Sequence, residues 1–206
     1  MKTKIITIMA ILFTITFQAQ AYVLTFDDIG TNVSGTIPDG YGGFNWSKSF
    51  DEGIFYYINV PLVIGTLTDS GIFNSLVSGD CVAWPSPYIY EGKGWISSDN
   101  PFIFQGVYIT SQWRDGLNIQ VDGYLNGSLV PGYSTMVTID TTGPTWSQFD
   151  YENIDELRFS ASGGTQHNGY EYDYTNFVMD NFTYIPEPAT LLLFALGTVL
   201  LRKQHS

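Results

Sequence analysis

Short runs in which apolar and polar residues alternate constrain this chain most. Residues 117–122 alternate strictly, and residues 157–161 repeat the pattern. Residues 102–109, 136–139 and 177–184 are rich in aromatic and β-branched side chains. A period of two places successive side chains on opposite faces of a strand, whereas no window between residues 22 and 184 holds a helical period. The pattern therefore predicts an all-β protein.

Turn-forming residues separate these runs at close intervals. They are Pro38-Asp39-Gly40, Arg114-Asp115-Gly116, Asn126-Gly127, Pro131-Gly132 and Ser162-Gly163-Gly164. Many short strands at this spacing favour a two-sheet antiparallel sandwich, with a jelly-roll-like topology as the leading expectation. Neither a repeat nor a linker interrupts the pattern, so residues 22–184 are predicted to form one domain.

The chain is acidic, with 8 Lys and Arg against 20 Asp and Glu and a formal net charge of −12. Residues 22–184 hold four of the basic and nineteen of the acidic residues, which leaves that stretch at about −15. Such a surface repels phosphate backbones, so no nucleic-acid partner is expected. It suits cations and neutral ligands such as glycans.

Residues 1–21 read as a secretory signal peptide. Lys2 and Lys4 form a basic start, residues 5–17 form an apolar run, and Ala19-Gln20-Ala21 supplies a small-x-small cleavage site. The protein is therefore predicted to be exported. Its single cysteine, Cys81, allows no internal disulfide and is expected to be a small core residue.

The other end carries a second hydrophobic segment. Pro186, Glu187 and Pro188 precede an apolar stretch that ends at Leu201, and Arg202 and Lys203 follow it. Counted from Ala189, the stretch is 13 residues long. As a helix it would measure about 20 Å against a hydrocarbon core of roughly 30 Å. The sequence predicts a short transmembrane helix that holds the protein weakly, with residues 22–184 outside the cytoplasm.

The order of these parts in residues 185–206 resembles the PEP-CTERM protein-sorting signal of Gram-negative bacteria. That resemblance implies an exosortase-type processing enzyme as a partner, which would act near Pro186-Glu187-Pro188. It also implies transient anchoring in the inner membrane, then a place at the cell envelope, on the cell surface or in the extracellular matrix. Bacteria with such signals often form exopolysaccharide or biofilm.

The middle of the chain also resembles the bodies of PEP-CTERM proteins, which are similar to carbohydrate-binding-module sandwiches. Residues 37–46 and 111–117 carry most of this likeness, together with Thr142-Gly143-Pro144-Thr145, Ser162-Gly163-Gly164-Thr165 and Met179-Asp180-Asn181-Phe182. The likeness favours the jelly roll. It implies no activity.

Residues for catalysis are sparse. The chain has two histidines, and His205 lies in the segment predicted to be removed, so a Ser-His-Asp triad would depend on His167. No G-x-S-x-G motif is present, and one cysteine with one usable histidine disfavours zinc. Two carboxylates suffice for glycoside hydrolysis, but none of the acids stands out as a pair. We therefore expect a protein that is not an enzyme.

A structural calcium ion is the one cofactor that the pattern supports. Asp27 and Asp28 end the first strand of the mature chain, and Asp180 lies inside the last. Asp180 has the parity of Val178 and Phe182, so a buried carboxylate is expected there. Hard oxygen ligands from two neighbouring strands suit Ca²⁺, and similar carbohydrate-binding modules carry calcium at this place. The alternative is that these acids are exposed or bound to turn amides.

Aromatic residues near polar turn residues are the candidates for binding extracellular polysaccharide. Sugar rings pack on exposed aromatic planes while carboxylates and amides bond their hydroxyl groups. Two stretches fit this pattern: Trp113-Arg114-Asp115 and the proline-stiffened loop from Trp84 to Tyr88. Trp95 is a further candidate. Trp46 and Trp146 are expected in the core, and the other tryptophans are core or surface with equal weight.

Together these features predict a non-catalytic, exported surface or biofilm-matrix protein that associates with glycans. Two alternatives stay open. One is a structural matrix or adhesion protein that binds no defined sugar, and the other is a polysaccharide-degrading enzyme.

Overall fold

The computed structural model describes residues 20–49, 51–63, 69–85 and 91–187. Its strands are β1 (Tyr22–Leu24), β2 (Ser34–Thr36), β3 (Asn45–Trp46), β4 (Lys48–Ser49), β5 (Gly53–Asn59), β6 (Cys81–Pro85), β7 (Lys93–Ser111), β8 (Arg114–Leu125), β9 (Ser128–Ile139), β10 (Thr145–Gln166) and β11 (Phe177–Pro186). Three short 3₁₀ turns join them: η1 (Tyr41–Gly43), η2 (Val60–Val63) and η3 (Gly71–Asn74). Within the described ranges there is no α-helix, and the all-β prediction is confirmed.

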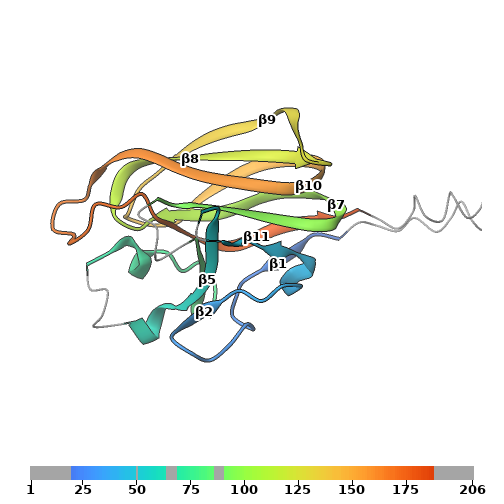
Figure 1. The fold of residues 1–206 in the computed structure, drawn as a ribbon. Helices are drawn as coiled ribbons and strands as arrows, with labels where there is room; N and C mark the ends of the chain where they lie inside the picture. The colour runs from blue at the N-terminus through green and yellow to red at the C-terminus, as the bar shows by residue number, and fades with distance from the viewer. Residues whose placement is uncertain (1–19, 50, 64–68, 86–90, 188–206) are drawn as a thin grey trace, which may run out of the picture.

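The strands pair only in antiparallel fashion, in the order β2-β5-β6-β11-β7-β10-β8-β9. Strands β9, β8, β10 and β7 form an upper layer, and β5 and β2 lie below it (Figure 1). The strand pairing that joins the two layers is short, because β11 and β6 pair only at Met179 and Ala83. The sheet therefore folds back on itself into the predicted sandwich.

Bulges in the two longest strands allow this bend. Strand β10 pairs with β7 at Ile154↔Phe102 and next at Glu156↔Ser97, so residues 98–101 of β7 have no partner residue on β10. Asp150 and Asn153 on β10 have φ angles of 51° and 52° next to these register shifts. Extra residues on one strand bend it and increase its twist. Each strand can thus follow the curved core along its whole length.

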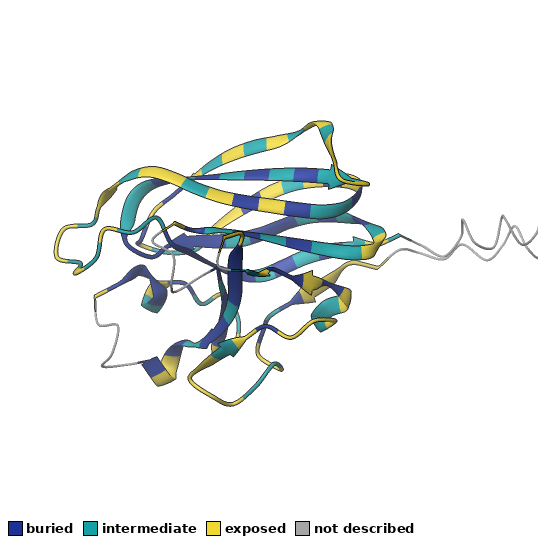
Figure 2. Ribbon diagram, in the orientation of Figure 1, coloured by how far each residue is buried: buried dark blue, intermediate teal, exposed yellow. Residues whose placement is uncertain are grey.

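The main core lies between the two layers and follows the alternation in the sequence. Leu117, Ile119 and Val121 are fully buried, while the residues between them reach the outer face (Figure 2). In this core, Phe55 of β5 and Trp46 of β3 meet edge-to-face with ring centres 5.2 Å apart. Trp46 is 1% exposed, which confirms its predicted place in the core.

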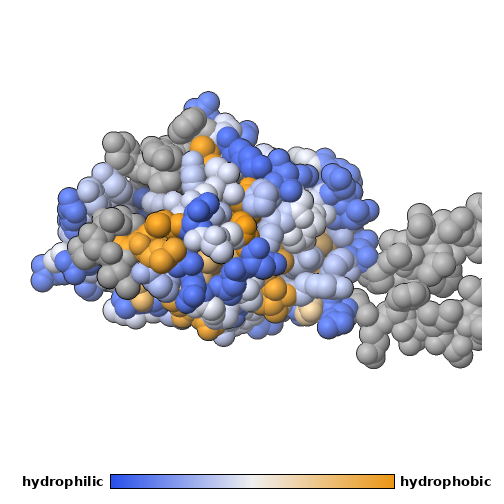
Figure 3. All heavy atoms as spheres, turned by 90° about the horizontal axis from the view of Figure 1, so that it is seen from below, coloured by the Kyte–Doolittle hydropathy of each residue, from blue (hydrophilic) through white to orange (hydrophobic). Residues whose placement is uncertain are grey.

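A second apolar cluster covers the other face of β5, β6 and β11. It consists of Ile58, Val60, Val63, Ile72, Val82 and Val178, and Phe73, Leu76 and Trp84 pack against it. These strands are therefore buried on both faces, which explains why β5 reads as a continuous run rather than an alternating one. From below, hydrophobic side chains reach the surface in separate groups among hydrophilic ones (Figure 3).

A bulge at Asn181 changes the face of β11 on which the following residues lie. Met179 and Phe182 both lie in the main core, whereas Val178 lies in the second cluster. The register of β11 against β7 shifts between Asp180 and Thr183, and Asn181 has a φ of 52°. A one-residue insertion moves every later side chain to the opposite face. The predicted shared parity of Asp180 and Phe182 is therefore wrong.

The last strand ends inside the predicted sorting motif. Pro186 pairs with Phe102, and the Glu187 amide donates to the Pro101 carbonyl at 3.3 Å. The folded domain thus runs past the expected boundary at residue 184. The predicted signal peptide covers residues 1–21, of which the structure describes residues 20 and 21. Pro188, Arg202 and Lys203 of the predicted sorting signal also lie outside the described residues. Across the described ranges, no helix is long and apolar enough to span a bilayer.

Candidate functional site

An open hollow of about 520 Å³ lies on the outer face of the upper layer. It spans β7, β10 and β8 and reaches the turn between β4 and β5. Its lining residues are Glu52, Lys93, Gly94, Trp95, Ser97, Asp122, Glu156, Arg158, Phe159 and Ser160. Alternation along β7 turns Trp95 outward between the buried residues Gly94 and Ile96. Apart from Gly94 and Phe159, which belong to the buried face, the hollow gathers side chains that the strand period assigns to the solvent face.

The indole of Trp95 is the aromatic wall of this hollow. It is half-buried, and its Nε1 donates a hydrogen bond to Oε2 of Glu52 at 3.0 Å. A ring fixed in this way keeps its orientation before a ligand arrives, which lowers the entropic cost of binding.

Arg158 lies in the middle of a row that crosses the strands. It is opposite Trp95 on β7 and opposite Asp122 on β8. Its guanidinium carbon lies 4.3 Å from the centre of the Tyr124 ring, and its Nε pairs with Glu156. The hydrogen bond to Glu156 raises the pKa of Arg158. The guanidinium is therefore a fixed, permanently charged donor.

The far end of the row is a polar network around Asp122. Its Oδ1 accepts hydrogen bonds from Gln120 Nε2 at 3.0 Å and from Ser134 Oγ at 2.7 Å. Gln120 Nε2 also donates to Ser134 Oγ at 2.9 Å. Together with Trp95 and Arg158, this face offers an apolar ring plane beside fixed donors and acceptors. Hydroxyl-rich ligands match that combination.

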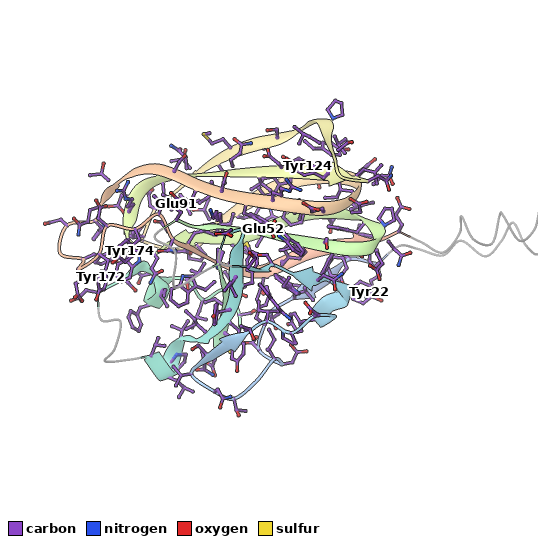
Figure 4. The ribbon with its side chains drawn as sticks, in the orientation of Figure 1. Tyr22, Glu52, Glu91, Tyr124, Tyr172 and Tyr174 are labelled. Atoms are coloured by element: carbon purple, nitrogen blue, oxygen red, sulfur yellow. The ribbon has the colours of Figure 1, made fainter. Side chains whose placement is uncertain are left out.

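The predicted set at the β7–β8 turn lies elsewhere, and Trp113 is not a surface platform. It is 3% exposed. Tyr170, Tyr172 and Tyr174 pack against it edge-on, with ring centres 5.1–6.5 Å away. The labelled pair Tyr172 and Tyr174 lies side by side in Figure 4. Residues 167–176 fold over the indole. Of the two positions that the sequence leaves open for Trp113, core and surface, the structure shows the core, so this ring offers no exposed plane to a sugar.

Arg114 and Asp115 hold the same loops in place. Arg114 Nη1 donates to the Gly163 carbonyl at 2.7 Å, and its Nε lies 2.8 Å from Asp173. Asp115 accepts a hydrogen bond from the Thr141 hydroxyl at 2.6 Å and contacts His167 Nδ1 at 2.6 Å. Burial acts to raise the pKa of Asp115, but these hydrogen bonds outweigh it and lower the pKa.

His167 makes no catalytic triad with these neighbours. Its Nδ1 contacts both Asp115 and the Thr141 hydroxyl, the latter at 3.0 Å. A triad needs the carboxylate on one ring nitrogen and the hydroxyl on the other. Thr141 is also fully buried. The cluster of Asp115, Thr141 and His167 therefore joins the loops that carry these three residues.

Of the second predicted platform, the loop from Trp84 to Tyr88, the structure describes Trp84 and Pro85. Trp84 lies on β6 opposite Tyr56 and packs against the second apolar cluster. Its indole nitrogen is buried without a hydrogen-bond partner in the described part of the chain. Tyr88 lies outside the described residues. Trp84 on β6 packs against the second apolar cluster, whereas Trp95 on β7 lines the hollow, so the structure does not bring the two rings together.

The sequence did not predict one aromatic pair on the outer face. Trp146, expected in the core, is 40% exposed on β10 and lies beside Tyr108 with ring centres 5.1 Å apart. The expectation for Trp146 is wrong because this position alternates onto the outer face. The residues that surround Trp95, namely Glu52, Asp122, Tyr124, Glu156 and Arg158, were also missed. Only cross-strand register brings them together.

The predicted calcium ligands do lie near one another. Strand β1 pairs with β11, with Leu24 opposite Phe182, so the first and last strands are adjacent as expected. Asp180 is 1% exposed. Desolvation raises the pKa of Asp180, with three amide hydrogen bonds opposing it. The Tyr41 hydroxyl donates to Asp28 at 2.8 Å.

Backbone amides occupy these carboxylates. Asp180 accepts from the N–H groups of Val77, Ser78 and Asn181 at 2.7–3.0 Å. Asp27 Oδ1 accepts from the N–H groups of Asp80 and Cys81 at 2.7 and 2.9 Å. Among the described residues, no three His, Cys, Asp or Glu side chains are grouped to hold a metal. The donor set does not fit a calcium cage, and the geometry matches the alternative of turn-amide binding. Calcium stays a prediction.

A comparison with solved structures supports the β-sandwich fold at a TM-score of 0.50. No family model matches the sequence, and no curated protein matches it. A DUF4465 family protein from Bacteroides caccae is 14% identical, with a TM-score of 0.50 over 84% of this chain and 95% of its own. A DUF4465 protein from Bacteroides ovatus is 12% identical (TM-score 0.42; 81% and 94% covered). TmCBM61 in complex with β-1,4-galactotriose is 9% identical (TM-score 0.34; 72% and 93% covered).

Proposed function

We propose that this domain binds neutral glycans, without catalysis, through the hollow around Trp95. The observation that carries the proposal is the row from Trp95 through Arg158 to Asp122 across three adjacent strands. One half-buried indole supplies a plane for a sugar ring, and the charged neighbours supply hydrogen bonds to hydroxyl groups. The proposed ligand is neutral because the chain carries a net charge of −12, which disfavours acidic polysaccharides.

Each carboxylate of the hollow already has a fixed donor partner. Glu52 accepts from Trp95, Glu156 from Arg158, and Asp122 from Gln120 and Ser134. A carboxylate held by protein donors has a fixed orientation, and its remaining lone pairs can accept hydrogen bonds from sugar hydroxyl groups. This arrangement supports an ordered surface for ligand binding.

A glycan array probed with the full chain tests this proposal. We expect signals on neutral polysaccharides that disappear for Trp95→Ala, and no release of reducing sugar from the bound ligand. Absence of binding to any glycan would support the structural matrix or adhesion protein instead. Turnover of a bound polysaccharide would support the enzyme.

We further propose that the domain acts outside the cell, after export and processing near Pro186-Glu187-Pro188. The support is the sequence: a signal-peptide pattern in residues 1–21 and a PEP-CTERM-like pattern in residues 185–206. Mass spectrometry of the protein from its native host is expected to find both hydrophobic ends missing. An intact segment 191–201 in the surface fraction would contradict the proposal.

A further inference from the structure

Strand β9 forms one free edge of the sheet. It runs for 12 residues and pairs with β8 on one side. On its other side, the described residues contribute no pairing strand, and Figure 1 shows β9 as the outermost strand of the upper layer. Its outward N–H and C=O groups are therefore available to another strand.

The usual protections of an edge are weak here. Folded proteins blunt long edges with charged residues, bulges or short strands. Residues 126–139 contain no charged residue, and Pro131 and Gly132 interrupt only the first half of β9. The remaining segment, Tyr133-Ser134-Thr135-Met136-Val137-Thr138-Ile139, has high β-propensity. The opposite edge strand β2, by contrast, is only three residues long.

Apolar side chains on β9 are also exposed. Met136 is 58% exposed and Leu129 is 46% exposed. Met136 is opposite Gln120 on the outer face of the sheet, so β8 does not cover it. A strand added beside β9 would bury part of both side chains and satisfy the free backbone groups.

We propose that β9 pairs with β9 of a second copy of this chain, giving a homodimer with one continuous sheet. The charge distribution leaves this edge as the place where two copies can meet. With a net charge of −12, two copies repel over most of their surfaces, whereas an uncharged edge lets them approach at low cost. A basic partner would gain more from the acidic surface than from this strand. Antiparallel pairing of one edge with itself satisfies two-fold symmetry.

This dimer has a consequence for the outer face. A two-fold axis perpendicular to the sheet reverses the strand direction but keeps both outer faces on the same side. The two Trp95 residues would be separated by seven strand spacings, or roughly 34 Å. Two hollows on one face could then engage one long polymer and increase avidity. The pairing itself rests on β9 alone and is independent of what the hollow binds.

Sedimentation equilibrium of the full chain in mild non-ionic detergent tests the pairing. We expect a monomer–dimer equilibrium that strengthens with salt, because salt screens the repulsion between like-charged copies. Met136→Lys places two like charges at the edge and is expected to weaken the dimer at least about tenfold. Ser162→Lys adds the same charge to an exposed position on β10 and is expected to change the dimer dissociation constant less than about twofold. Both variants keep the hydrophobic ends, so association through those ends would not distinguish them.

Cysteine crosslinking supplies a second readout. The native Cys81 is 1% exposed, so we expect it not to form crosslinks between copies of the folded protein. Under oxidising conditions, at least one of Ser134→Cys, Met136→Cys and Thr138→Cys is expected to form a disulfide-linked dimer, whereas Ser162→Cys stays monomeric. A wild-type monomer at every soluble concentration would overturn the proposal. So would equal dimerisation of Met136→Lys, or capture of an extended foreign peptide at β9 without self-association.

Discussion

Trp95 Nε1 and Glu52 Oε2 lie 3.0 Å apart, although 43 residues separate them in the sequence. Their hydrogen bond connects β7 to the turn between β4 and β5. Gly53 makes the approach possible: it has a φ of 95°, and a Cβ there would lie 1.9 Å from the Lys93 carbonyl oxygen. The wall of the hollow thus depends on one backbone contact that only glycine permits.

Gly53→Ala is expected to destabilise the protein by more than about 3 kcal/mol, because strain and a backbone clash add. Gly169 is the matched control. It has the same φ of 95° but nothing within 4 Å of its would-be Cβ, so Gly169→Ala reports strain alone. Its expected cost is about 1 kcal/mol. Urea unfolding measures both, and equal costs would refute the importance of the close approach.

Asp180→Ala is expected to lower the free energy of unfolding by about 3 kcal/mol, because the N–H groups of Val77 and Ser78 lose the buried carboxylate that accepts their hydrogen bonds. Asp99 lies in the exposed β7 bulge, so Asp99→Ala is expected to stay within about 0.5 kcal/mol of the wild type. Chemical denaturation of the two variants provides the measurement. A small cost for Asp180→Ala would mean that water replaces the carboxylate.

The pH dependence of stability is expected to have opposite signs at Asp180 and Asp115. Burial raises the pKa of Asp180 in the folded protein, so the folded state binds its proton more tightly than the unfolded state. That contribution to stability is present below the unfolded pKa of 3.8 and is lost as the pH rises through the folded pKa. At Asp115, hydrogen bonds outweigh burial and lower the pKa. Its contribution is present above 3.8 and is lost as the pH falls.

Unfolding free energies of the wild type, Asp180→Asn and Asp115→Asn between about pH 3 and pH 6 measure these slopes. The wild type should lose stability relative to Asp180→Asn as the pH rises. It should gain stability relative to Asp115→Asn over the same change. Two slopes of the same sign would show that one of the carboxylates has a different environment.

Melting in EDTA and in calcium separates the two explanations for the acids near β1 and β11. If backbone amides satisfy Asp27 and Asp180, the melting temperature is expected to be the same in both solutions. A calcium ion bound only by the folded state would add roughly 2.7 kcal/mol at a hundredfold excess over its Kd. A fall of several degrees in EDTA, absent in Asp180→Ala, would establish the calcium site that the sequence predicts.

The fold was accessible from the sequence because its signal is local. Alternation at Leu117, Ile119 and Val121 depends only on the strand period, and it correctly places these residues in the core. The position of the hollow is not local. Arg158 meets Trp95 and Asp122 because of the strand register. Bulges in β7 and β10 shift that register, and no simple sequence pattern marks the residues that form them.

The tryptophans show the same limit. Trp113 and Trp146 both lie near turns, and the strand period does not say which ring another segment covers. Residues 167–176 fold over Trp113, whereas Trp146 alternates onto an open face. The bulge at Asn181 similarly separates Asp180 from the face of Phe182. In each case tertiary packing decided the outcome.

Calorimetric titration of one neutral polysaccharide into the wild type, Trp95→Ala and Trp146→Ala tests the central claim most directly. Removal of a central aromatic contact is expected to cost on the order of 2 kcal/mol, or about a thirtyfold loss of affinity, at Trp95. Trp146 is an exposed tryptophan outside the hollow, so Trp146→Ala is expected to bind like the wild type. Unchanged affinity for Trp95→Ala, or an equal loss for Trp146→Ala, would contradict the assignment of the hollow as the glycan site.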